Sequence, residues 1–333
     1  GQYQRAIRAP NVGELFGGRA NGFPPATDPC AQAVAATDAT IRQLCIQTGV
    51  PAPLVGNPAV QLNAQIEGIF GGNPDLEEEV SDTWTVGVVL RPSFVPRLNI
   101  TIDGYDITVE KAVAAFGGGL ANTLNLCYNI IQDINSPYCQ AIAQGGRDPR
   151  TGIIGGDFSP LILNDNVGAL ETRGIDFQVD YSHPLGFSMT GAGESRLSFF
   201  VLATYVDKFD ITPVSDAPDL VNECAGRFGA LVCANPVPEW KWTTRLSLLD
   251  GPVTVSGRWR HLNGVRDDDD DTAYTIERIG SYDLFDLSFA FDVNDNLTLN
   301  MGVNNLFDRE PPILGVNQEQ SNTYPATYAG IGR

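Results

Sequence analysis

The chain has 333 residues, of which 43% are hydrophobic, and its 40 acidic against 21 basic residues give a formal net charge of −19. This balance argues against a nucleic-acid-binding protein, because such proteins neutralise phosphates with lysine and arginine. No apolar run approaches the roughly 20 residues that a membrane-spanning helix needs, but a barrel strand places only every second residue on lipid and escapes that test.

Segments in which apolar and polar residues alternate recur along the chain, and this period of two is typical of β-strands with one apolar face. They lie at 84–91, 98–109, 175–181, 197–206, 240–248, 253–260, 285–293 and 297–304. The match to this alternation is weakest at 197–206, where both the odd-numbered and the even-numbered positions are apolar. With a strand ending near Phe16 and another beginning at 327–331, we expect about ten strands. The chain also opens without a starting Met and stops within that last segment, so both ends look cut.

One strand changes the face that carries its apolar residues. Ile100 and Ile102 alternate with polar residues up to Gly104, after which the apolar positions shift by one to Tyr105 and Ile107. An extra residue in one strand moves the following side chains to the other face, so the shift at a glycine predicts a β-bulge.

The connections between these segments alternate between short and long. Tight turns are expected at 92–97, 250–252 and 294–296, and long links at 17–76, 112–163, 213–238, 266–280 and 309–326. A soluble β-sandwich shares the alternating strands, but short turns at one end and long loops at the other are typical of membrane barrels. Aromatic residues near strand ends suit the headgroup levels of a membrane; they are Trp84, Tyr105, Tyr181, Trp240, Trp259 and Tyr282.

The six cysteines occur as three sequential pairs, each within one long, Gly/Pro/Asn-rich link. The pairs are Cys30 with Cys45, Cys127 with Cys139, and Cys224 with Cys233. Sequence alone leaves 15 pairings open. Local disulfides are the simplest solution and imply an oxidising compartment. Free cysteines and a zinc site are the alternatives, although no Cys-x-x-Cys occurs.

Charged residues suggest two further candidate sites. Alternate positions on neighbouring strands form a candidate lumen lining, which either supports a polar interior or offers a path to an anionic solute: Lys241, Arg245, Arg258, Arg260, Asp286 and Asp292. A run of aspartates is a weak metal candidate: Asp267, Asp268, Asp269, Asp270 and Asp271. The run lacks the glycine and distal glutamate of an EF-hand loop, and a solvated loop is its plainer interpretation. The segment 126–143 is expected to form a short helix within its loop.

No motif of catalysis or cofactor binding is present in the sequence. The chain has no Gly-x-Ser-x-Gly, no His-Glu-x-x-His and no Gly-rich phosphate loop, and it contains two histidines. We therefore expect no enzyme activity, no catalytic residues and no cofactor.

Four segments resemble the TonB-dependent receptors of Gram-negative outer membranes. They are RAPNVGELF at 8–16, DGYDI at 103–107, TRGID at 172–176 and VNNLFDREPP at 303–312. The resemblance implies an all-β, antiparallel transmembrane barrel of 22 strands around an N-terminal plug. Residues 1–333 would form the C-terminal portion, with plug and first strands absent and the last strand truncated.

The resemblance also implies a function. A receptor of this kind binds a scarce solute (carbohydrate, siderophore-iron or similar) and imports it with energy from the TonB complex, which would act through the missing N-terminal part. Its surroundings are outer-membrane lipid. The sequence does not indicate the solute, although the long cysteine-containing loops are more similar to carbohydrate-type members. Two alternatives stay open: a passive porin-like or structural barrel, and a secreted β-sandwich adhesin or carbohydrate-binding module.

Overall fold

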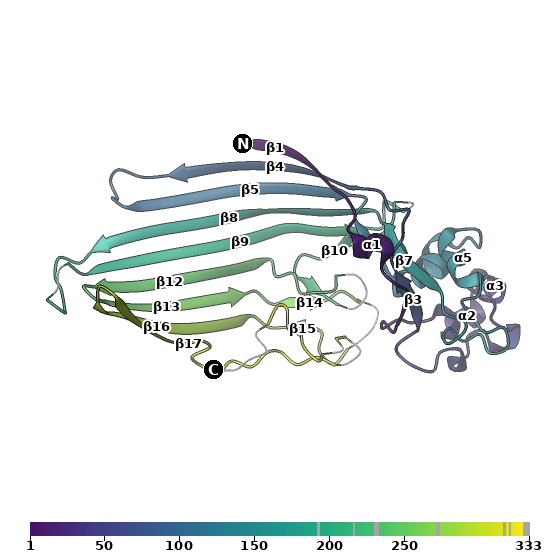
Figure 1. Ribbon diagram of the computed structural model, residues 1–333. Coiled ribbons are helices and arrows are strands. Elements are labelled where there is room, and N and C mark those ends of the chain that lie inside the picture. The colour runs from purple at the N-terminus through teal and green to yellow at the C-terminus, as the bar shows by residue number, and fades with distance from the viewer. Residues whose placement is uncertain are drawn as a thin grey trace.

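A sheet of long antiparallel strands forms the body of the computed structural model (Figure 1), which describes residues 1–191, 194–215, 217–229, 233–270, 274–315, 318–319 and 321–328. Each strand pairs with the next long strand of the chain, and the short β10 (Asn222–Glu223) pairs with β9. In sheet order the long strands are β1 (Gln2–Arg8), β4 (Glu79–Leu90), β5 (Leu98–Glu110), β8 (Ala169–Pro184), β9 (Arg196–Thr212), β12 (Trp240–Asp250), β13 (Val253–Leu262), β16 (Tyr282–Asn294) and β17 (Leu297–Val303).

The strand pairing gives this sheet one apolar and one polar face. The apolar face carries, among others, Trp84, Val86, Val88, Ile100, Ile102, Ile175, Phe177, Val179, Phe199, Val201, Trp240, Leu246, Val255, Trp259, Phe285, Leu287, Phe289 and Met301. The polar face carries Thr85, Asp103, Asp176, Gln178, Thr204, Lys241, Arg245, Arg258, Arg260, Asp286 and Ser288. Apolar-face side chains are open, with Val86 68% and Met301 55% exposed. An apolar surface of this extent requires an apolar covering.

The β-bulge predicted at Gly104 is wrong. Gly104 stays in register with Val86 of β4 and Ile175 of β8, and no shift occurs along β5. The apolar residues change face without an extra residue: Tyr105 lies on the polar face and covers Gly174, where an added Cβ would lie 2.5 Å from the tyrosine hydroxyl oxygen. An aromatic ring over a glycine of the neighbouring strand restores the packing that the glycine lacks.

A bulge does occur, in the neighbouring strand pair. Arg173 of β8 pairs with Lys208 of β9, whereas Gly174 pairs with Val206. Asp207 is therefore the extra residue of β9. Such a bulge redirects a side chain, and here the Asp207 carboxylate accepts hydrogen bonds from the Arg173 guanidinium at 2.8 and 2.5 Å.

Short turns and long loops lie at opposite ends of the sheet, as predicted (Figure 1). At one end the chain turns within residues 91–97, 185–195, 251–252 and 295–296. The long connections all emerge at the other end. This end also contains α1 (Val12–Phe16), where a continuation of the first strand was expected.

Helix α1 begins where β1 stops because of its capping residues. The Asn11 side chain accepts a hydrogen bond from the Glu14 amide, and the Glu14 carboxylate accepts one from the Asn11 amide. This reciprocal capping box satisfies two amides that would lack partners at a helix start. The first strand therefore ends at Arg8, not near Phe16.

The first two long loops fold together into one body, here called the cap (residues 17–76 and 112–166). Their strands form a mixed sheet in the order β2-β3-β7-β6, in which β3 and β7 are parallel. The first loop supplies β2 (Ala20–Gly22), η1 (Pro29–Ala31), α2 (Val34–Thr37), α3 (Ala39–Gln47), η2 (Ala52–Leu54), η3 (Pro58–Val60) and β3 (Gly68–Gly71). The second supplies β6 (Val113–Ala115), η4 (Phe116–Gly118), α4 (Leu120–Asn125), the π-helix η5 (Leu126–Ile131), α5 (Pro137–Ala143) and β7 (Leu161–Asn166). The helix expected within 126–143 is thus two helices.

The remaining loops (residues 213–239, 263–281 and 304–328) are here called the loop cluster, and they have a core of their own. The start of the third loop joins the cap instead, since Val214 lies in the core of the cap and Ala217 and Leu220 pack against it. The loop cluster contains β11 (Arg227–Phe228), β14 (Val265–Asp267) and β15 (Arg278–Ile279). Phe228, Tyr324 and Tyr328 pack in its core against Tyr282 and Leu284 of β16. Of the last strand expected at 327–331, Thr327 and Tyr328 lie in a turn and the rest lies outside the described residues.

The long sheet has two open edges in the described part of the chain. Here β1 pairs with β4 alone and β17 with β16 alone. Among the described residues, no helix is long and apolar enough to cross a membrane.

Candidate functional site

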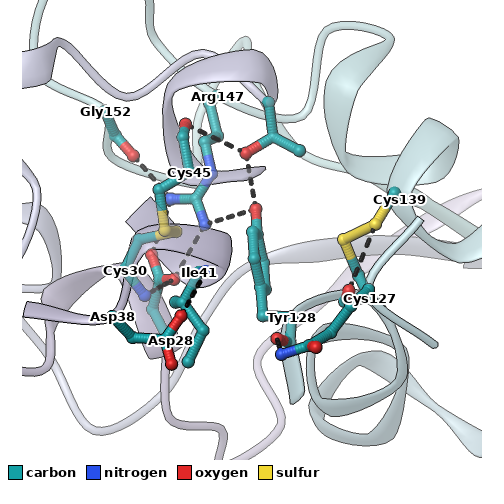
Figure 2. Close-up of a disulfide and its surroundings, with 12 residues drawn as sticks. Asp28, Cys30, Asp38, Ile41, Cys45, Cys127, Tyr128, Cys139, Arg147 and Gly152 are labelled. Atoms are coloured by element: carbon teal, nitrogen blue, oxygen red, sulfur yellow. Dashed lines mark hydrogen bonds and ion pairs between the residues drawn. A yellow bond between two sulfur atoms is a disulfide. The ribbon is translucent and has the colours of Figure 1, made fainter. Parts of the chain in front are cut away.

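The cap is held together by two disulfides and one buried ion pair (Figure 2). Cys30–Cys45 closes the first loop around α3, and Cys127–Cys139 joins η5 to α5 in the second. Each bridge removes conformational freedom from the unfolded loop, an effect of about 2–4 kcal/mol in the usual model.

Arg147 of the second loop reaches across the cap to Asp28 of the first. Its two terminal nitrogens donate to the two carboxylate oxygens of Asp28 at 2.6 and 2.7 Å, and the Arg147 and Asp28 side chains are 0% and 1% exposed. Arg147 also donates to the Gly152 carbonyl and, at 3.1 Å, to the Tyr128 hydroxyl, which shares a 2.6 Å hydrogen bond with Thr48. The planar guanidinium thus joins both loops in one geometry.

Protonation in the cap follows from this burial. Burial raises the pKa of the Tyr128 hydroxyl, although the neighbouring Arg147 charge opposes the shift. Burial lowers the pKa of Arg147, but the Asp28 charge, the Tyr128 oxygen and the hydrogen bonds to both together outweigh burial, and the net shift is upward. Tyr128 is therefore neutral and Arg147 charged throughout the physiological range.

The third cysteine pair lies in the loop cluster, where Cys224 is bonded to Cys233. The backbone amide of Cys233 donates to the Asp268 carboxylate at 2.8 Å, which ties this disulfide to the aspartate run. The described chain contains no free cysteine, so each sequential pair is bonded as the local arrangement predicted.

The side chains of the described aspartates in the run contact different partners within the loop cluster and do not converge on a common metal position. Asp267 is buried and accepts a 2.6 Å hydrogen bond from Gln318, and Asp270 pairs with Arg227 at 3.1 Å. Burial, with the charges of Asp268 and Asp269, raises the pKa of Asp267. Asp271 lies outside the described residues. No group of three or more acidic, histidine or cysteine side chains suited to a metal occurs among the residues that are described.

Three of the candidate lumen residues meet on the polar face of the sheet. Asp286 of β16 accepts hydrogen bonds from Arg258 at 2.7 Å and from Arg260 at 3.2 Å. It also accepts one from the backbone amide of Asn305 at 2.8 Å. This shared carboxylate connects β13, β16 and the start of the last loop.

The other three candidates are distributed along the same face. Arg245 lies directly opposite Arg258 in the pairing of β12 and β13, and Lys241 is four residues further along β12. Asp292 lies at the turn end of β16, where it accepts a hydrogen bond from Thr298, and it does not join the arginine cluster. Within the described chain, neither Lys241 nor Arg245 has an ion-pair partner.

A hollow of about 430 Å³ opens where the polar face meets the loop cluster. Its lining includes Lys241 of β12, Arg260 of β13, Tyr282 of β16 and Tyr328 of the last loop. The Tyr328 side chain is 1% exposed and its hydroxyl has no hydrogen-bond partner among the described residues. Burial raises the pKa of Tyr328 to about 12, so the hydroxyl keeps its proton. A buried donor without an acceptor is costly and is therefore a candidate contact for a ligand.

The aromatic residues expected at headgroup levels divide between the two faces. Trp240 and Trp259 lie on the apolar face near the loop end of the sheet, and Tyr181 lies on it near the turn end. Trp84 lies on the same face but midway along β4. Tyr105 and Tyr282 lie on the polar face and are not part of such a row. Successive side chains of a strand point to opposite faces, so the face of an aromatic residue depends on whether its position is odd or even along the strand and not on its distance from the strand end.

The long loops carry most of the net negative charge, because they contain a proportionate share of the acidic residues but fewer of the basic ones. Residues 9–78, 111–168, 213–239, 263–281 and 304–333 contain 24 of the 40 acidic residues but only 10 of the 21 basic ones. The loop end of the molecule is thus acidic, whereas the hollow beneath it presents Lys241 and Arg260.

Comparison with known proteins identifies this architecture. The profile of the family described as "TonB dependent receptor-like, beta-barrel" matches residues 1–306. A doubly substituted ferric enterobactin receptor PfeA from Pseudomonas aeruginosa is 15% identical, with a TM-score of 0.54 over 99% of this chain and 36% of that chain. A singly substituted PfeA in complex with enterobactin is 13% identical, with a TM-score of 0.51 over 99% and 35%.

These likenesses concern the fold, and the chain spans about a third of the length of either receptor. A search of curated protein sequences found no match. The profile match covers most of the chain, including all nine long strands. The chain therefore belongs to the family of TonB-dependent receptor β-barrels.

Proposed function

We propose that this chain is the C-terminal barrel portion of an outer-membrane receptor that binds a scarce solute and imports it with energy from the TonB complex. The apolar face of the sheet would contact lipid, and the polar face would line the lumen beneath the cap and the loop cluster. The family is one of receptors rather than of enzymes. Coupling to the TonB complex would require an N-terminal plug outside residues 1–333.

The hollow under the loop cluster is the observation that carries this proposal. It offers the Lys241 ammonium, without an ion-pair partner in the described chain, and it is lined by Tyr328, whose buried hydroxyl lacks an acceptor there. Such donors favour a solute rich in acceptor oxygens, such as a ferric siderophore or an acidic carbohydrate. The PfeA receptor is named for ferric enterobactin, which makes the siderophore class the first to test.

The experiment is uptake by cells that carry the full-length receptor, with a panel of ferric siderophores and oligosaccharides. Active transport predicts uptake that ceases when the TonB complex is inactivated. Equal uptake without it would favour a passive porin, and recovery of the protein as a soluble monomer without detergent would favour a secreted β-sandwich.

Two variants test the hollow itself. Lys241→Met removes a charge-assisted contact of about 1.5–3 kcal/mol, which predicts roughly 10- to 150-fold weaker solute binding. Tyr328→Phe removes a neutral hydrogen bond, with a loss of about 2- to 12-fold. Tyr324→Phe is the matched control, because Tyr324 is also buried with an unpartnered hydroxyl but does not line the hollow. Equal effects of the two tyrosine variants would contradict the site.

A further inference from the structure

The pairing of β9, β12, β13 and β16, which lie side by side in Figure 1, arranges the polar face in levels of directly opposed residues. Lys241 and Arg260 lie on the first two levels from the loop end and line the hollow under the loop cluster. The third level places Arg245 of β12 directly opposite Arg258 of β13, outside the lining of that hollow. Two residues of a strand span about 7 Å, so this arginine pair lies roughly 7–14 Å closer to the turn end than the cations of the hollow.

The arginine pair carries more positive charge than its surroundings neutralise. Side chains directly opposite each other in an antiparallel sheet lie close together, and like charges in such positions are destabilising. Asp286 supplies one negative charge, which is already shared between Arg258 and Arg260. Arg245 is exposed and has no ion-pair partner in the described chain. An anion bound between Arg245 and Arg258 would remove this repulsion.

The side of Arg245 that lies away from Arg258 offers no compensating charge at the same level. Its neighbour on β9 is Phe200, an uncharged side chain. Beyond Phe200, Asp180 of β8 lies two strands from Arg245, a separation of about 10 Å. The Asp180 carboxylate accepts a hydrogen bond from Gln178 at 2.7 Å. Arg245 is therefore placed between a second guanidinium and an aromatic ring.

A row of serines crosses five neighbouring strands on the next level toward the turn end. Its members lie opposite one another from β8 to β16: Ser182, Ser198, Ser247, Ser256 and Ser288. Ser247 and Ser256 lie next to the arginine pair, each two residues from an arginine of its own strand, and their hydroxyls share a 2.7 Å hydrogen bond. One hydroxyl uses its proton in this bond, so the other keeps a proton for a further acceptor. Serine side chains are short, so the arginines project further from the sheet than the row beside them.

We propose that Arg245 and Arg258, with the hydroxyl pair beside them, form a second binding site for a carboxylate or phosphate group of the imported solute. The proposal rests on the proposed function, because that function places the polar face in the lumen. Two guanidinium groups bind such an anion through charge-assisted hydrogen bonds, and the remaining serine proton adds a neutral one. A solute with several anionic groups would keep one group on a cation while another moves from the hollow toward the turn end.

The experiment measures how fast phenylglyoxal modifies individual arginines of the full-length receptor, followed by mass spectrometry of its peptides. The probe is tricarballylate, whose three carboxylates can contact both arginines, and acetate at equal ionic strength is the reference. Arg196 is the internal control, because it is an exposed arginine of the same face that lies opposite Leu249 and Pro184. With the probe at about ten times its dissociation constant, Arg245 should react about 11-fold more slowly, and Arg196 at an unchanged rate.

Paired serine variants test the hydroxyls. Ser247→Ala/Ser256→Ala should raise the tricarballylate concentration that half-protects Arg245 by roughly 2- to 12-fold, because one neutral hydrogen bond is lost. Ser182→Ala/Ser198→Ala is the matched control, since this pair belongs to the same row but lies beside Asp180 and Phe200. Equal shifts in the two double variants would show that the hydroxyls beside the arginines are not part of the site.

Three results would overturn the second site. Equal protection of Arg245 and Arg196, or none, would mean that no anion binds between the arginines. An Arg245 that does not react even in acetate would already be covered by another part of the receptor, such as a carboxylate of the plug. Loss of Arg245 protection in Lys241→Met would mean that the hollow and the arginine pair are one site.

Protection is measured without transport, which separates this proposal from the proposed function. TonB-dependent uptake by a receptor whose Arg245 is not protected would refute the second site alone. Protection of Arg245 in a receptor that shows no TonB-dependent uptake would refute the proposed function and leave the anion site in place.

Discussion

Replacing Arg147 by methionine should open the cap locally while leaving the long sheet intact. The substitution keeps most of the buried volume but leaves the Asp28 carboxylate, 1% exposed, without its guanidinium partner. Removing one member of a buried ion pair costs about 3–5 kcal/mol. Because every 1.4 kcal/mol is a factor of ten, the population of opened cap should rise by roughly 100- to 4,000-fold.

Amide hydrogen exchange on the full-length receptor measures this population. Amides of α3 and α4, which belong to different loops but share the core of the cap, should exchange faster together by that factor. Amides of β12 and β13 should be unchanged. Asp28→Asn should act in the same direction, because it leaves the Arg147 charge buried.

The control is Arg42→Met, which removes a half-buried cap arginine whose guanidinium makes a solvent-exposed hydrogen bond to the Ala52 carbonyl at 3.4 Å. It should change exchange by less than about threefold, as surface contacts contribute little. In the double variant Asp28→Asn/Arg147→Met, the loss should be smaller than the sum of the single losses. If Arg147→Met behaves like Arg42→Met, the ion pair does not hold the cap together and this reasoning fails.

Three further variants test other parts of the structure. Asp286→Asn leaves two guanidinium groups facing each other on the polar face and should lower thermal stability by about 1–2 kcal/mol, since these arginines are partly solvated; an unchanged melting temperature would contradict the role of the carboxylate. Because the folded pKa of Asp267 is raised, its contribution to stability is present below the unfolded pKa and is lost as pH rises through the folded one; Asp267→Asn should therefore slow hydrogen exchange of the loop cluster at pH 7 but not at pH 3, and equal effects at both would count against this. Replacing Cys127 and Cys139 by alanine should destabilise the cap by about 3 kcal/mol, seen as faster proteolysis of the second loop, whereas resistance equal to the unsubstituted receptor would show that the bridge is dispensable.

The strands were predictable because their signal is local. Alternation at positions such as Phe285, Leu287 and Phe289 depends on neighbours two residues apart, and the structure places these residues on one face. The alternation of short and long connections likewise follows from the sequence. The sequence of β5 does not reveal that the Tyr105 ring packs over a glycine of the neighbouring strand. The change of apolar face at Gly104 was therefore interpreted as a bulge, although the strand is regular there.

The cap was not predictable, because its determinants are distant in sequence. Asp28 and Arg147 are 119 residues apart, and no pattern around either marks the other. The parallel pairing of β3 with β7 joins two loops that were expected to be separate. The cysteine pairs were visible as loop features, but the core that surrounds them was not. Helix α1 was missed because the Asn11–Glu14 capping box was not considered.

The shared sheet of the cap also constrains the order in which the chain can assemble. Strand β3 is complete at residue 71, but its parallel neighbour β7 begins at residue 161, after β4 and β5 have run the length of the sheet and back. The apolar residues of the first loop therefore stay exposed until the second loop has reached the loop end of the sheet and can pack against them. The Cys30–Cys45 bridge, closed by residues 15 apart, can form during that interval. It would keep α3 compact until Arg147 arrives, so an oxidant available early in assembly should raise the yield of folded receptor.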